Sequence, residues 1–192
     1  MPERDPPGCS HFEYSLIQIS SITAGLLAFP LWGKHADLVG NAAVLKTASF
    51  LIALNPFLWL FGRTAPVLMA IEFFSGFAWG AFNLCAVNFV FDAVSPAKRV
   101  RCLGYFSLII GVALFAGTSI GGLLADRVHF LPGPPLLSLI LISGVLRITA
   151  HFLLSGNFKE VRSSARRVSS RKLFFSVVGF ESLTEEKKPY QE

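Results

Sequence analysis

Apolar residues fall into long runs along this chain, and charges rarely interrupt them. A helix needs about 20 residues to cross the hydrocarbon core of a membrane. Short polar links separate the runs, and short links make successive helices antiparallel neighbours. The pattern therefore predicts an all-α membrane protein with five antiparallel transmembrane helices, in a transmembrane domain over residues 14–155, at 14–32, 42–61, 66–94, 102–125 and 134–155.

The two ends of the chain have a different character. Residues 1–13 are polar and rich in proline, and residues 156–192 contain a basic, serine-rich stretch, then the apolar run at 173–180, then a charged end. Two interpretations of this last part are open. It is either a solvated basic tail, or an interfacial segment whose basic stretch meets anionic lipid while 173–180 enters the headgroup layer.

Composition supports lipid as the solvent. The chain is 53% hydrophobic and only 15% charged, whereas soluble domains carry about 25% charged residues. A net charge of +5 could indicate nucleic acid. The basic residues lie at the ends of apolar runs and form no basic face, so we exclude a nucleic-acid partner and expect membrane lipid instead.

The distribution of Lys and Arg predicts the orientation. One side of the predicted zigzag carries Lys34, the 98–101 cluster and the basic stretch within 156–192; the other side carries only Arg4, Arg63 and Arg127. Because cytoplasmic loops are enriched in Lys and Arg, residues 1–13 are expected to be extracytoplasmic and the tail cytoplasmic. An odd number of spans without a signal peptide leads us to expect further sequence before residue 1.

The link between the first two spans carries a recognisable motif. Residues 33–41, GKHADLVGN, place Gly33, Asp37 and Gly40 at the fixed positions of G-x-x-x-D-x-x-G. This resembles the loop signature of the major facilitator superfamily, although the family's later basic residues are replaced by Leu38, Asn41 and Ala42. Residues 91–107 and 117–126 also resemble the region of the family's tenth and eleventh helices.

The resemblance implies a fold and a function. It matches the five spans to helices eight to twelve, the C-terminal half of a transporter in a bacterial inner (plasma) membrane. The implied function is secondary transport of a small solute of unknown identity, by rocking of two helical bundles. As one truncated or split half, the chain is expected to need a missing N-terminal half or a second copy. The alternative is a non-transporting membrane scaffold or regulatory bundle.

The motif residues are expected to have distinct physical roles. Gly33 and Gly40 permit a tight turn. The resemblance makes Asp37 a latch between the two transporter halves on the cytoplasmic side, and Arg99 is a plausible partner within this chain. The alternative for Asp37 is an ordinary solvated loop residue.

Polar residues within the spans are costly and usually face a cavity or a partner. Glu72, Trp79 and Asn83 recur at helical spacing on one face of the third span. The corresponding helix in the family lines the central cavity, so these residues and Gln18 are the candidates for the substrate pathway. Two interpretations of Glu72 are open: a proton-coupling carboxylate or an interfacial carboxylate. Gln18 either lines the cavity or simply bonds to a neighbouring helix.

Two small-residue patterns predict close helix packing: Gly76-x-x-x-Gly80 and Gly117-x-x-x-Gly121. The sequence presents no catalytic constellation, phosphate loop or metal-spaced His/Cys set. We therefore expect no enzyme activity, no cofactor and no metal.

Overall fold

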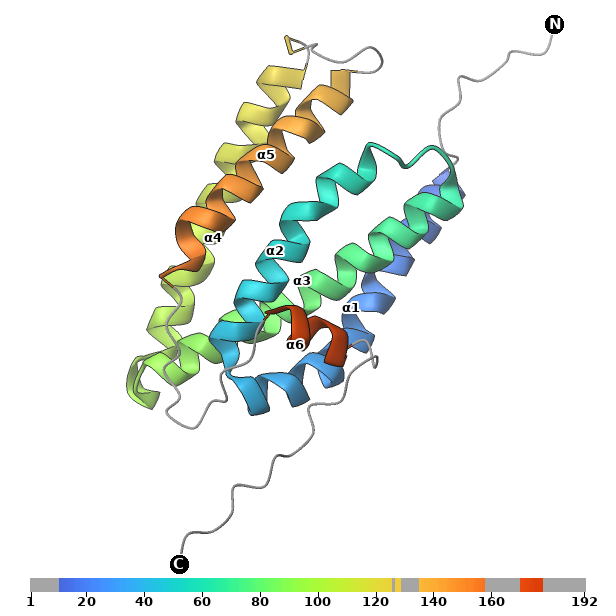
Figure 1. Ribbon diagram of the computed structural model, residues 1–192. Coiled ribbons are helices and arrows are strands. Elements are labelled where there is room, and N and C mark those ends of the chain that lie inside the picture. The colour runs from blue at the N-terminus through green and yellow to red at the C-terminus, as the bar shows by residue number, and fades with distance from the viewer. Residues whose placement is uncertain (1–10, 126, 129–134, 158–169, 178–192) are drawn as a thin grey trace, which may run out of the picture.

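The computed structural model describes residues 11–125, 127–128, 135–157 and 170–177. This part of the chain is helical, and Figure 1 shows its helices as a tilted bundle. Five helices are long and apolar enough to cross a membrane. They are α1 (His11–Val39), α2 (Asn41–Trp59), α3 (Ala65–Ala93), α4 (Pro96–Ala125) and α5 (Pro135–Ser155), and the short helix α6 (Ser170–Val177) follows them.

Three helices are longer than a membrane crossing requires, and two of them, α1 and α4, are also longer than the predicted spans at 14–32 and 102–125. α1 and α3 have 29 residues and α4 has 30, which at about 1.5 Å per residue exceeds a hydrocarbon core of about 30 Å. Most of the predicted link at 33–41 is therefore helical, because α1 continues to Val39 and only Gly40 separates it from α2. In the same way, α4 begins at Pro96 and contains most of the predicted link at 95–101.

The core of the bundle forms where α3 packs between α1 and α2. Small residues of α1 and α3 let these helices approach, and Trp32 fills the space beside them with no exposed surface. Its ring lies 5.4 Å from the Phe77 ring, centroid to centroid. Cys85 is also fully buried here. Burial of these side chains holds α1, α2 and α3 together, while α5 packs on the other side of α2.

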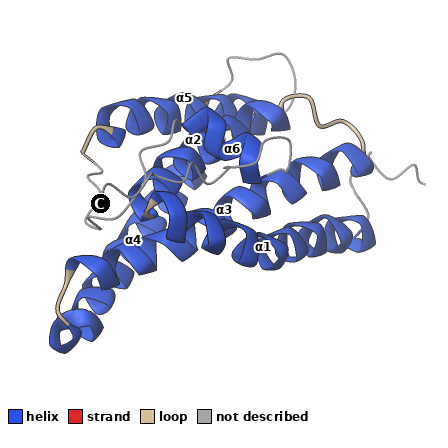
Figure 2. Cartoon of the chain, turned by 60° about the horizontal axis from the view of Figure 1, so that its bottom comes forward, coloured by secondary structure: helices blue, strands red, loops and turns tan. Residues whose placement is uncertain are grey.

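Helix α4 is different, since none of its residues is buried. It touches α3 and α5 only slightly. In Figure 2, α4 and the turn that joins it to α3 extend away from α1. Large apolar side chains such as Leu108, Ile109 and Phe115 are more than 60% exposed. This surface is suited to lipid or to another apolar helix.

The predicted tail contains a docked helix. α6 lies against the ends of α1 and α2 (Figure 1). Leu173 has no exposed surface and Val177 is 5% exposed. His35 Nε2 of α1 lies 3.0 Å from Ser176 Oγ of α6. Within the first part of the apolar run at 173–180, Leu173 and Val177 are therefore buried against protein. Whether the rest of the tail is solvated or lies at the membrane surface stays a prediction. Residues 158–169 and 178–192 lie outside the described residues.

Candidate functional site

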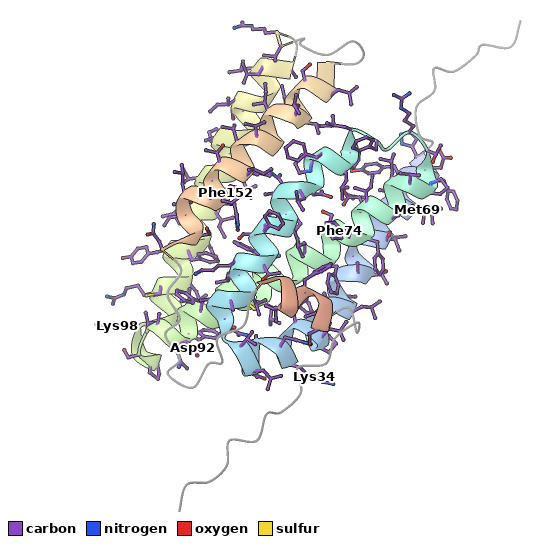
Figure 3. All side chains as sticks on the ribbon, in the orientation of Figure 1. Lys34, Met69, Phe74, Asp92, Lys98 and Phe152 are labelled. Atoms are coloured by element: carbon purple, nitrogen blue, oxygen red, sulfur yellow. The ribbon has the colours of Figure 1, made fainter. Side chains whose placement is uncertain are left out.

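A cavity of about 360 Å³ opens between α1, α2 and α3, at the end of the bundle near Met69 in Figure 3. Short connections place its walls: the turn after Trp59 reverses the chain so that the last turn of α2 faces the first turns of α3. Two of the predicted pathway residues, Gln18 and Glu72, line this cavity, together with Tyr14 and Trp59.

The polar groups of this cavity are held in position by hydrogen bonds. Trp59 Nε1–H donates to Glu72 Oε1 at 3.0 Å. Gln18 Nε2 donates to the Tyr14 hydroxyl at 3.4 Å along one turn of α1. The result is one carboxylate among aromatic rings, and this combination is suited to a ligand with a positive charge and apolar surface.

The other two predicted pathway residues lie elsewhere. Trp79 and Asn83 are on the same α3 face, farther along the helix, and neither lines this cavity. Trp79 is 40% exposed and meets the edge of the Phe82 ring, with ring centroids 5.9 Å apart. Asn83 is exposed. Both side chains therefore belong to a surface of α3 that the described part of the chain leaves open.

The motif residues occupy the opposite end of the bundle. Gly40 has φ 89°, a conformation that favours glycine, and its N–H donates to Ala36 O at 2.9 Å. Gly33 is partly buried and Asp37 is exposed on the last turns of α1. Arg99 donates to Phe91 O at 3.2 Å and lies over the Phe91 ring. The predicted role of Asp37 as a latch remains a prediction.

Gly76 and Gly80 lie where α1 and α3 are closest. A Cβ on Gly76 would be 2.0 Å from Ser21 O, and one on Gly80 would be 3.0 Å from Gly25 O. The second glycine pair differs. A Cβ on Gly117 would have no neighbour within 4 Å in the described part of the chain, and one on Gly121 would be 3.9 Å from Leu139. Among the described residues, no atom of another helix approaches Gly117 closely, because α4 has few contacts with α3 and α5.

Sequence reasoning missed several polar contacts inside the bundle. Asn41 Nδ2 donates to Asp92 Oδ2 at 2.7 Å, joining the start of α2 to the end of α3. Asn55 Nδ2 donates to Ser75 Oγ at 3.2 Å between the same helices. The cavity role of Trp59 beside Glu72 was predictable, because the predicted short link at 62–65 places the end of one span beside the start of the next. The Asn41–Asp92 and Asn55–Ser75 pairs depend on helix rotation, which the sequence does not specify.

Comparisons with known proteins agree with the motif. The family model described as Major Facilitator Superfamily matches residues 7–185. The chain is 22% identical over 125 residues to the quinolone resistance protein NorA of Staphylococcus aureus (strain MRSA252), covering 65% of this chain and 32% of NorA. It is 28% identical over 108 residues to multidrug resistance protein 1 of Bacillus subtilis (strain 168), covering 56% of this chain and 28% of that protein.

The chain thus spans about a third of the length of the curated relatives it matches. No solved structure gives a significant match. The family match covers most of the chain and agrees with five membrane-length helices. The chain is therefore an integral membrane protein, and it belongs to the major facilitator superfamily.

Proposed function

We propose that this chain forms one wall of a secondary transporter that exports small organic solutes carrying a positive charge. Family membership over residues 7–185 supports transport, and the names of two relatives, quinolone resistance and multidrug resistance proteins, support drug-like substrates. The observation that carries the proposal is the cavity in which the Glu72 carboxylate lies among Tyr14 and Trp59. In this proposal the chain is a transporter component of a bacterial plasma membrane and has no enzymatic role.

The cavity residues suggest how a solute would be held. An organic cation would place its charge near Glu72 and its apolar surface against the aromatic rings, which attract cations through their faces. The hydrogen bond from Trp59 to Glu72 keeps the carboxylate oriented before the solute enters. Preorganisation of this kind lowers the cost of binding.

A complete pathway needs a second wall. In transporters built from two bundles, the solute site lies between the bundles, and the bundles rock to expose it to each side in turn. The exposed α3 residues Trp79 and Asn83 would then face the partner bundle across the pathway. That partner would be an N-terminal half or a second copy of this chain.

Binding of tetraphenylphosphonium, a lipophilic cation, to the chain in nanodiscs tests this proposal. We expect Glu72→Gln to weaken binding by about tenfold, which corresponds to about 1.4 kcal/mol. Glu13→Gln is the matched control, because Glu13 is a carboxylate in the first turn of α1, at the same end of the bundle, and does not line the cavity. Equal affinity of the wild type and Glu72→Gln would remove the support for this substrate class and favour a non-transporting scaffold.

A further inference from the structure

A second cavity, of about 510 Å³, lies at the other end of the bundle, between α2, α5 and α6. Residues distant in sequence meet there: Lys46 and Phe50 from α2, His151 and Ser155 from the last turns of α5, and Phe174 from α6. None of these residues lines the cavity that contains Glu72. The second cavity is therefore a separate site, and its role does not depend on the solute proposed above.

The polar groups of this second cavity favour an anion. Lys46 lies in the second turn of α2, and no ion pair to its ammonium group is found within the described residues. The Ser155 hydroxyl lines the same cavity. Ser49 Oγ lies 2.9 Å from His151 Nδ1, which fixes the orientation of the imidazole ring. A positive charge in such a cavity attracts phosphate or carboxylate groups.

The remaining walls favour an apolar chain. Phe50 and Phe174 contribute aromatic surface, and the Phe50 ring lies 5.5 Å from the His151 ring. Next to the cavity, Phe152 and Leu153 of α5 are 68% and 72% exposed, on a surface suited to hydrocarbon. A small hydrated anion would lose its water here in exchange for a single cation, which is unfavourable. A ligand with an anionic head and an apolar chain matches both the polar groups and the aromatic walls of the cavity.

The position along the bundle also fits a lipid. The cavity is at the end that carries Lys34 and Lys98 (Figure 3), where the spanning helices leave the hydrocarbon. Lipid phosphates lie at this depth, and lysine side chains reach toward them from helix ends. We propose that the α2–α5–α6 cavity binds one anionic phospholipid, with its phosphate at Lys46 and Ser155 and an acyl chain against Phe50 and Phe174.

Docking of α6 completes this site. Phe174 reaches the cavity because Leu173 and Val177 of the same helix are buried against the ends of α1 and α2. A bound lipid would therefore touch α2, α5 and α6 at once. Since a ligand that binds only the assembled form stabilises that form, the lipid should hold α6 in its docked position.

The test measures lipid binding to the whole chain in a neutral detergent, by native mass spectrometry and by titration. We expect one tightly bound phosphatidylglycerol and at least tenfold weaker phosphatidylcholine. Lys46→Gln should reduce phosphatidylglycerol affinity at least tenfold. Lys34→Gln is the matched control, because it removes an exposed cation from the same end of the bundle without lining the cavity, and it should leave the affinity unchanged.

Four outcomes would overturn the proposal. Equal loss in Lys46→Gln and Lys34→Gln would indicate general surface attraction. Inorganic phosphate that displaces phosphatidylglycerol at equal concentration would indicate a site for soluble anions. Absence of a tightly bound phosphatidylglycerol in the wild type would indicate no site. If Lys46→Gln does not fold, Phe174→Ala in α6 removes apolar lining outside the spanning helices and should lower the affinity several-fold; an unchanged affinity would overturn the proposal.

Discussion

Single residues decide how closely α1 and α3 approach. Gly76 lies against the backbone of α1, where an added methyl group would be 2.0 Å from Ser21 O and 2.7 Å from Ser21 C. Backbone atoms cannot give way as the end of a flexible side chain can, so any side chain here must push the helices apart. Close backbone approach through small residues is a main source of helix association in membranes. Gly76 is therefore a structural position of the bundle.

We predict that Gly76→Ala destabilises the chain by about 1–3 kcal/mol, the usual cost of overpacking a well-packed contact. Thermal unfolding in detergent, followed by circular dichroism, would measure the change. The matched control is Gly117→Ala, where an added methyl group meets no described atom within 4 Å. Alanine is also the better helix former, so the control should be neutral or slightly stabilising. A similar loss of stability in both variants would contradict this account.

Among the helices, α6 is the one whose position depends on few side chains. It has 8 residues, and an isolated helix of this length is unstable in water. Its order therefore comes from burial of Leu173 and Val177 and from the contact between His35 and Ser176. α6 packs across the ends of α1 and α2.

We predict that Leu173→Ala releases α6, because truncation of a buried leucine costs about 2–5 kcal/mol. Trypsin cleavage after Arg171 or Lys172 should then become faster, measured by mass spectrometry as the rate at which these two bonds are cut. Val100→Ala removes a side chain that is 83% exposed at the same end of the bundle, and it should leave the rate unchanged. Unchanged cleavage in Leu173→Ala would show that α6 is held by other contacts.

The sequence was sufficient for the elements that hydrophobic runs determine, and insufficient for contacts that depend on rotation and docking. The five long helices and the turn at Gly40 followed from run length and from one motif. Residues 33–39 were expected to be a link, but polar residues continue a helix readily once it leaves the membrane. The pairing of Asn41 with Asp92 depends on how α2 and α3 face each other. Burial of Leu173 needed tertiary structure, because an apolar run beside a basic stretch also fits a membrane surface.

The whole molecule has two chemically different ends. Figure 3 places Lys34 and Lys98 at one end and Met69 toward the other, and Gly40 lies in the turn near the first end while residues 60–64 form a turn at the second. Because Lys and Arg are retained on the cytoplasmic side, the first end is expected to be cytoplasmic. The two turns flank α2 and should therefore lie on opposite sides of the membrane.

Single cysteines near these turns test this orientation. Leu38 is 53% exposed and Phe61 is 75% exposed, and neither carries a charge that could influence insertion. In a chain whose native cysteines are replaced by alanine, a membrane-impermeant maleimide should label Phe61→Cys in intact cells. It should label Leu38→Cys only after the cells are permeabilised, while the cysteine-free chain stays unlabelled. The opposite pattern would reverse the orientation and place the proposed lipid site in the outer leaflet. Labelling of both positions in intact cells would mean that α2 does not cross the membrane.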